Sequence, residues 1–177
     1  MGKPRRLTHS LVLETAARLA NDSGDARRVT LTDLAGWGLR QLLAATRQAV
    51  AGKVGREALR AIAHAYRAFA HAQPGVYPLT VTAPDPNEAE LTGLATELVS
   101  LLQLVLASYG LSGEAALHAI RGLRSLLHGF VSLETAGGFG LPLERDQSFD
   151  YLLTIFFDGL QQLPGHISRA EAASLAT

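Results

Sequence analysis

The chain has 177 residues, and its 16 Lys and Arg residues balance its 16 Asp and Glu residues, so the net charge is zero with histidine neutral. Apolar residues make up 47% of the chain, which excludes global disorder and allows one domain, or a small domain fused to a larger one, with a buried core. Zero net charge excludes a uniformly basic nucleic-acid-binding surface, although not a basic patch. The absence of cysteine excludes a disulfide scaffold, thiolate metal sites and cysteine catalysis.

The charges are distributed unevenly along the chain. Residues 1–30 hold six basic and three acidic side chains, and the rest of the chain carries the matching excess of negative charge. A basic start on a mildly acidic body suits contact with phosphate at one end of the molecule. A solvated, flexible terminus has the same composition, so both interpretations stay open on charge alone.

No membrane span or export signal is predicted. The longest apolar stretch, residues 101–111, is interrupted by Gln103 and Ser108 and is shorter than the roughly 20 residues that cross a bilayer. The basic start is not followed by an apolar run, because Glu14 and Arg18 interrupt it. We therefore expect a soluble cytoplasmic protein with no membrane partner.

Two capped helices are predicted near the start of the chain. Thr8 is a suitable N-cap for a helix over residues 8–23, which Gly24 ends. Thr30 can cap a second helix, and Asp33 three residues later completes a capping-box arrangement.

The remaining segments also show the apolar spacing of helices and no alternation typical of strands, so we predict an all-α fold. The expected helical segments are residues 39–52, 56–72, 88–109, 112–135 and 146–163, with a short helical turn in 76–81. Residues 164–177 are expected to form a weakly structured tail.

Two helices near the C-terminal end predict a homodimer. Small residues recur along one face of residues 112–135, which lets another backbone approach closely, and residues 146–163 are apolar nearly all round and therefore need cover on every side. A two-fold dimer with a four-helix interface would provide that cover, and a helix buried wholly within one subunit is the alternative. The predicted interface residues are Gly122, Ser125, Gly129, Leu152, Ile155, Phe156 and Leu160.

Motifs for catalysis are not found. The sequence has neither a Gly-x-Ser-x-Gly elbow nor a P-loop, and the glycine-rich residues 137–140 follow a helix and not a strand, which argues against a dinucleotide site. Glu114 and His118 have the spacing of a shared metal site, but no third ligand is recognisable, so we interpret them as a surface pair. We predict no enzyme, no cofactor and no metal site.

Four segments resemble the TetR family of bacterial transcriptional regulators. Two are weak alone: the basic start with its capped helix, and residues 29–35 (VTLTDLA), which resemble the opening of the family's second helix. Residues 65–77 (AYRAFAHAQPGVY) are similar to a segment of one ligand-domain subgroup. Residues 124–134 (RSLLHGFVSLE), followed by GGFG, are similar to that subgroup's Trp-His-Gly signature, with Leu127 in the Trp place.

The resemblance implies a small N-terminal helix-turn-helix head over residues 1–43 and a ligand-binding and dimerisation bundle over residues 44–163. It fails at Trp37–Gly38, where the family has a tight turn and a recognition helix and this chain has no room for either. A true deletion is one explanation. We prefer a segment omitted between Trp37 and Gly38, which predicts a break in the chain there.

The resemblance also implies an effector pocket among the middle helices, and few charges fall there, so a small apolar or aromatic effector is expected. The predicted pocket residues are Tyr66, Phe69, Tyr77, Thr80, Leu101, Gln103, Val105, Leu126, His128 and Phe130. For His128, a structural role in the core or interface is the alternative.

The resulting hypothesis is a homodimeric repressor of transcription that a small molecule releases from double-stranded operator DNA. The predicted DNA-phosphate contacts are Arg5, Arg6, Thr8, Thr30 and Thr32. Base-reading residues would lie in the absent segment. The alternative is a dimer that does not bind DNA and acts as a small-molecule sensor or protein-interaction module.

Overall fold

The computed structural model describes Ala16 and residues 29–163, and every regular element within them is helical, which confirms the all-α prediction. The elements are α2 (Leu31–Val50), α3 (Gly55–Ala72), η1 (Tyr77–Thr80), α4 (Ala89–Leu106), η2 (Ala107–Tyr109), α5 (Gly113–Thr135) and α6 (Arg145–Gln161). The predicted helix over residues 8–23 and the tail over residues 164–177 lie outside the described residues.

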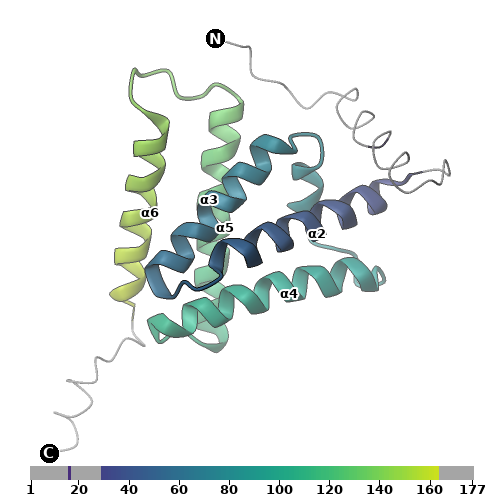
Figure 1. Cartoon of the computed structure of the whole chain (residues 1–177), viewed down its shortest axis with the longest axis horizontal. Coiled ribbons are helices and arrows are strands. Elements are labelled where there is room, and N and C mark those ends of the chain that lie inside the picture. Colours follow the sequence, from purple (N-terminus) through teal and green to yellow (C-terminus); the bar gives the residue numbers. More distant parts are fainter. Residues whose placement is uncertain (1–15, 17–28, 164–177) are drawn as a thin grey trace, which may run out of the picture.

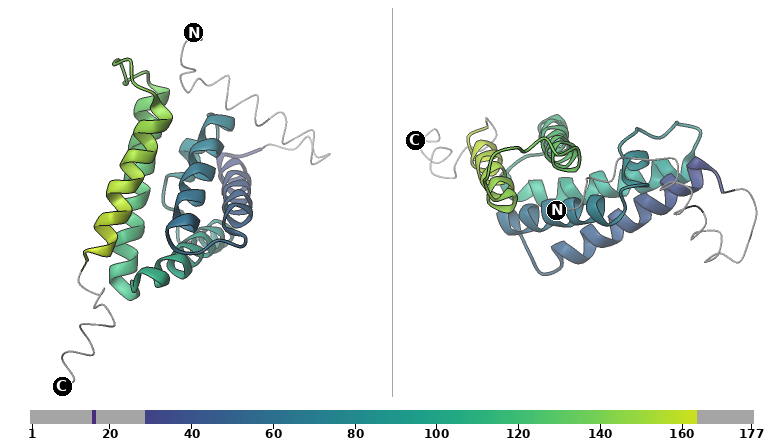
Figure 2. Two further views of the ribbon diagram at one scale, coloured as in Figure 1. Left: turned by 60° about the vertical axis from the view of Figure 1, so that its left-hand side comes forward. Right: turned by 90° about the horizontal axis from the view of Figure 1, so that it is seen from above.

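The helices form two groups (Figures 1 and 2). The antiparallel helices α5 and α6 lie side by side, and α2, α3 and α4 pack together against them. The main core lies where α3, α5 and α6 meet and includes Leu59, Leu127, Phe149 and Phe157, with Leu106 contributed by α4. A second, smaller core cluster joins Leu42 of α2 to Phe69, Tyr77 and Val131.

Helix α2 begins as the sequence predicts. Oγ1 of Thr30 accepts a hydrogen bond from the backbone N–H of Asp33 (3.1 Å), and the backbone N–H of Thr30 donates to Oδ2 of Asp33 (2.8 Å). These two bonds are the expected capping box, and they satisfy N–H groups that have no partner inside the helix.

Helix α2 continues without interruption past Trp37 and Gly38 to Val50. The predicted break in the chain at this point is therefore not confirmed. The two segments expected to be separate helices share one buried face, because Leu34, Gly38 and Leu42 recur every four residues. A Cβ atom on Gly38 would clash with Val76 and lie 2.8 Å from Cγ2 of Thr80, so glycine is what allows η1 to approach the helix.

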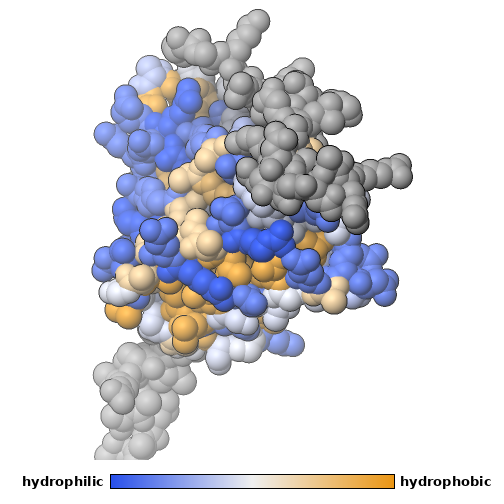
Figure 3. Space-filling view, turned by 45° about the vertical axis from the view of Figure 1, so that its right-hand side comes forward, coloured by the Kyte–Doolittle hydropathy of each residue, from blue (hydrophilic) through white to orange (hydrophobic). Residues whose placement is uncertain are grey.

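Helix α4 is unusually apolar for its degree of burial. Residues Ala89–Tyr109 are long and apolar enough to cross a membrane by length and composition alone, with a mean hydropathy of 1.6. Only Leu91 and Leu106 of α4 are fully buried, and Leu104 is 73% exposed. On the face shown in Figure 3, apolar side chains reach the surface between hydrophilic ones. In the fold, α4 packs against α2, α3 and α5.

A buried ion pair ties α3 to α5. Arg67 donates from Nε to Oε2 of Glu134 (2.9 Å) and from Nη2 to Oε1 (2.6 Å), and the two side chains are only 12% and 6% exposed. The guanidinium of Arg67 also lies over the rings of Phe130 (5.5 Å) and Phe149 (4.9 Å). This bidentate geometry is the strongest kind of Arg–carboxylate contact, so it fixes the register of the two helices.

Two further side chains complete this cluster. Nε2 of His71 lies 2.8 Å from Oε2 of Glu134, and Nη2 of Arg67 lies 2.8 Å from Oδ1 of Asp146 at the start of α6. Burial alone would raise the pKa of Glu134, but the hydrogen bonds from Arg67 and His71 outweigh burial and lower it. Glu134 is therefore an ionised partner of Arg67 at neutral pH.

We predict that Glu134→Gln lowers the free energy of unfolding by about 3 kcal/mol, because it removes the buried carboxylate from Arg67 and leaves only the exposed Asp146 beside that charge. The matched control Asp146→Asn removes a carboxylate from the same arginine at a site that is 85% exposed, and it should cost less than about 1 kcal/mol. Urea unfolding at one protomer concentration measures both. Equal losses in the two variants would contradict a dominant role for the buried pair.

Candidate functional site

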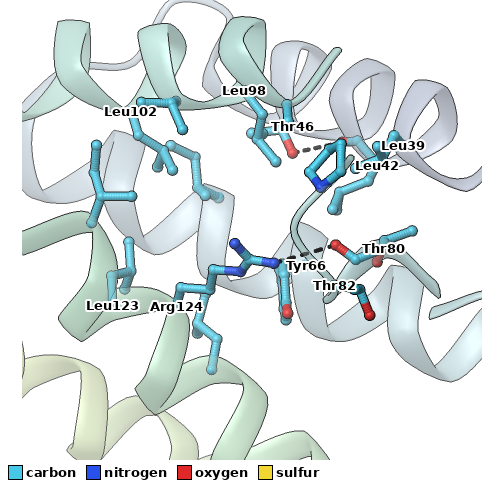
Figure 4. A pocket seen from close by; sticks show the side chains of 16 residues that line it. Leu39, Leu42, Thr46, Tyr66, Thr80, Thr82, Leu98, Leu102, Leu123 and Arg124 are labelled. Atoms are coloured by element: carbon cyan, nitrogen blue, oxygen red, sulfur yellow. Dashed lines mark hydrogen bonds between the residues drawn. The ribbon is translucent and has the colours of Figure 1, made fainter. Parts of the chain in front are cut away.

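A cavity of about 100 Å³ lies between α2, α3, α4 and α5, beside η1 and the segment that follows it (Figure 4). Its walls are mainly apolar. The lining residues are Leu39, Leu42, Thr46, Ile62, Tyr66, Thr80, Thr82, Pro84, Ala95, Leu98, Val99, Leu102, Ile120, Leu123, Arg124 and Leu127.

The helices build this cavity by presenting one stripe each. Four lining residues of α4 lie at positions 95, 98, 99 and 102, and four of α5 lie at positions 120, 123, 124 and 127. Both sets have the spacing i, i+3, i+4 and i+7, which places side chains on one face of a helix. Helix α2 contributes Leu39, Leu42 and Thr46 in the same manner. The cavity therefore forms because each helix is rotated so that this one face points toward the other helices.

Two threonine hydroxyls in the lining have partners within the fold. Oγ1 of Thr46 donates to the carbonyl oxygen of Leu42 (2.6 Å), and Oγ1 of Thr80 donates to that of Tyr77 (2.7 Å). With these donors engaged, the cavity surface is apolar with a few fixed polar points. Such a combination is typical of small-molecule sites between the helices of bundles.

Arg124 is the charged residue of the lining. Its Nη2 donates to the carbonyl oxygens of Thr80 (3.4 Å) and Val81, which lie at the end of η1. Figure 4 shows the side chain reaching from α5 toward Thr80 beside Tyr66. No carboxylate among the described residues pairs with Arg124, so its positive charge is not balanced locally.

A chain of polar contacts leads from the cavity wall into the protein. The hydroxyl of Tyr66 lies 3.1 Å from that of Tyr77, and the Tyr77 hydroxyl lies 2.6 Å from Nδ1 of His128. Nε2 of His128 lies 3.5 Å from Oγ of Ser132. Burial raises the pKa of both tyrosines, more strongly for Tyr77, so both are neutral phenols. His128 therefore supports the wall from behind through Tyr77.

Residues 59–156 match the family described as "Tetracyclin repressor-like, C-terminal domain", a span of more than half of the chain that includes α5, most of α3 and much of α6. The chain belongs to the TetR family. This membership supports the prediction of a regulator and not an enzyme.

Two relatives are named as regulators with a helix-turn-helix. The chain is 33% identical over 129 residues to the "Uncharacterized HTH-type transcriptional regulator YobS" of Bacillus subtilis. The matched residues make up 72% of this chain and 66% of that protein. It is 39% identical over 117 residues to the "Uncharacterized HTH-type transcriptional regulator Rv0681" of Mycobacterium tuberculosis. The matched residues make up 66% of this chain and 53% of that protein. The matched part thus spans just under two thirds of the first relative and about half of the second.

Two solved structures share the fold. A protein of unknown function from Rhodococcus sp. RHA1 matches with a TM-score of 0.65 at 23% identity and covers 92% of this chain and 97% of its own. SCO4313, described as a regulatory protein, matches with a TM-score of 0.59 at 24% identity and covers 84% of this chain and 87% of its own. At these identities the likeness establishes the fold alone.

The TetR-like pocket predicted from the sequence overlaps this cavity at Tyr66 and Thr80. Leu101, Gln103 and Val105 lie on α4, but the phase of the helix places them off the stripe that lines the cavity. Their prediction as lining residues is not supported by the structure, because only positions 95, 98, 99 and 102 of α4 line it.

The aromatic residues predicted for the pocket mostly fill the core instead. Phe69 and Tyr77 lie in the second core cluster, and Phe130 lies in the main core with Leu126 packed against it. His128 lies behind Tyr77 and does not line the cavity. Its contacts with Tyr77 and Ser132 agree with the structural alternative for His128.

Of the five residues predicted to contact DNA phosphates, the structure describes two, Thr30 and Thr32. Arg5, Arg6 and Thr8 lie outside the described residues. Thr30 is the N-cap of α2, and its Oγ1 lies 2.7 Å from Oδ2 of Asp33, whereas Oγ1 of Thr32 donates to Oε1 of Glu88 (2.8 Å). Both threonines thus already bind carboxylates within the fold.

Some of the residues predicted for the dimer interface are packed inside the subunit, and others are exposed on its surface. Leu160 is 3% exposed in the main core, so it faces its own subunit and not a partner. Phe156 packs on Gly122, with a ring carbon 3.2 Å from the position of a Cβ atom there. Leu152 is half-buried against the core, but Ser125 is exposed, Gly129 has no heavy atom within 4 Å of a Cβ atom, and Ile155 is 55% exposed.

The main residue that the sequence analysis missed is Arg124. It was noticed only as the start of a family signature, although it interrupts the apolar stripe of Ile120, Leu123 and Leu127. The signal that could have found it is a charged residue that interrupts an apolar helix stripe, because it brings a positive charge beside an apolar surface.

We predict that Ala95→Leu, which adds methylene groups toward the cavity, changes the free energy of unfolding by less than about 1 kcal/mol. The matched control Ala116→Leu adds the same atoms at a fully buried core position and should cost about 1–3 kcal/mol. Urea unfolding measures both variants. A loss in Ala95→Leu as large as that in Ala116→Leu would mean that the space is not available in solution.

Proposed function

We propose that this chain is a small-molecule-responsive transcriptional regulator of the TetR family that works as a cytoplasmic homodimer. In this proposal it is a repressor that an apolar or aromatic effector releases from operator DNA. The single observation that carries the proposal is that α2 forms one wall of the cavity. The same helix leads back, through Thr30, to the basic N-terminal residues.

The proposed response is a shift between two positions of α2. An effector between α2 and α4 contacts Leu39 and Leu42 on one side and Leu98 and Leu102 on the other. If it binds one position of α2 more tightly than the other, it shifts the population by that difference in affinity and by nothing more. The N-terminal end of the helix then moves with the cavity wall.

The proposed dimer uses the outer face of α5 and α6. On this face, small residues at Ser125 and Gly129 lie open, and Ile155 and Tyr151 expose apolar surface. An isologous four-helix interface would cover both helices at once. The partner would thereby supply the cover that α6 lacks on its outer side.

We predict that Ile155→Lys shifts the dimer toward monomer, because it places a charge in the centre of an apolar interface. The matched control is Leu104→Lys, a change of the same kind at an exposed position of α4. Sedimentation velocity over a range of protein concentrations should show dissociation in the first variant alone. A dimer that is unaffected by Ile155→Lys would contradict this interface.

One observation favours a second candidate function. Because α2 is continuous, the described residues hold no separate recognition helix, and such a helix is what reads bases in a helix-turn-helix. The second candidate is a dimer that senses a small molecule and does not bind DNA. In that case the cavity and the α5–α6 face would carry the whole function.

DNA binding by the whole chain distinguishes the two candidates. We predict that it binds the upstream region of its gene at low salt, and that changing Arg5 and Arg6 to Gln makes the slope of log K against log salt less steep by roughly two, one phosphate contact for each arginine. Fluorescence anisotropy from about 50 to 200 mM salt measures the slope. Absence of binding at low salt, in a preparation that still binds small molecules, would support the second candidate.

A further inference from the structure

We infer that the cavity takes a small carboxylic acid as its carboxylate, with one ring or a short branched chain in the apolar part and the carboxylate on Arg124. This inference rests on the proposed ligand-binding function and adds the chemical class of the ligand. It sharpens the expectation of an apolar or aromatic effector by assigning it one negative charge.

The charge balance of the arginines carries the first step. Five of the eight arginines in the described residues contact a carboxylate: Arg40, Arg47, Arg56, Arg60 and Arg67. The other three are Arg121, Arg124 and Arg145, and of these only Arg124 lines the cavity. Arg124 faces a cavity with an apolar lining and has only carbonyl oxygens as partners. An arginine beside low-dielectric surface without a local anion favours an anionic ligand.

The geometry of Arg124 carries the second step. Its Nη2 is held by the carbonyl oxygens of Thr80 and Val81, which fixes the guanidinium at the cavity wall (Figure 4). The Nε and Nη1 donors have no partner among the described residues. A guanidinium held in place with donors to spare is pre-organised for a carboxylate, since little side-chain freedom is lost when the ligand binds.

Size and charge together limit the ligand class. A cavity of about 150 Å³ in another protein accepts benzene, and this one is about 100 Å³ and is lined in part by the exposed Arg124. The apolar part of the ligand is therefore no larger than one ring. The lining has one positive side chain, which matches a single negative charge better than the double charge of a phosphate.

The test compares acids with their uncharged amides on the purified whole chain. The probes are benzoate, phenylacetate and isovalerate, each paired with its amide, and binding is measured by thermal shift and titration calorimetry. For at least one pair, we expect the wild type to bind the acid about tenfold or more tightly than the amide. Acids and amides that bind equally well, or amides that bind better, would overturn the inference.

Variants of two arginines on the same helix locate the effect. Arg124→Gln should abolish the preference for the acid while amide binding changes by less than about threefold, and Arg124→Lys should retain part of it. Arg121→Gln, at an exposed position one turn away, should leave the preference intact. Because acid and amide are compared on one variant, a change in its folding stability does not imitate the result. A preference for acid that survives Arg124→Gln would overturn the inference.

The inference and the proposed function fail in different ways. If toluene or another uncharged apolar compound binds, is excluded by Ala95→Leu, and no acid is preferred, the carboxylate inference is wrong and the proposed ligand cavity stands. If neither acids, amides nor uncharged apolar compounds bind the wild type, both are wrong.

Discussion

The buried ion pair between Arg67 and Glu134 is the constraint on which the rest of this fold depends. It fixes α3 against α5, and the stacking of Arg67 on Phe130 and Phe149 brings α6 into the same register. Nearer the other end of the same two helices, α3 presents Ile62 and Tyr66, and α5 presents the stripe that contains Arg124, to the cavity. One wall of the site is rigid because a shift of these helices would leave a buried charge unpaired.

Helix α4, in the other wall of the cavity, is held more weakly. Helices α2 and α4 are joined at the surface by Arg40 with Glu90 and Arg47 with Glu97, and exposed pairs of this kind contribute about 0–1 kcal/mol each. Few residues of α4 are fully buried. A ligand that enters between the rigid wall and α4 displaces α4 more easily, and α4 is joined to α2 by these surface pairs.

The sequence predicts the helices well and the cavity poorly, and the reason is physical. Helix ends depend on local signals, such as the Thr30–Asp33 capping box, and the helix expected over residues 112–135 is found at Gly113–Thr135. The residues that line a cavity depend on how each helix is rotated about its axis once the helices have packed together. Aromatic residues such as Phe69 and Phe130 looked suitable for a pocket, but large apolar side chains gain most free energy in the core, and there the structure places them.

The continuity of α2 joins sensing to whatever precedes it in the chain. A helix of 20 residues is about 30 Å long and moves as a stiff rod, so a displacement at Leu42 or Thr46 reaches Thr30 without a turn to absorb it. Gly38 keeps η1 close to the middle of this rod, and Arg124 holds the end of η1 through Thr80 and Val81. A carboxylate on Arg124 would therefore act at the point where η1 supports α2, whether the residues before Thr30 contact DNA or another protein.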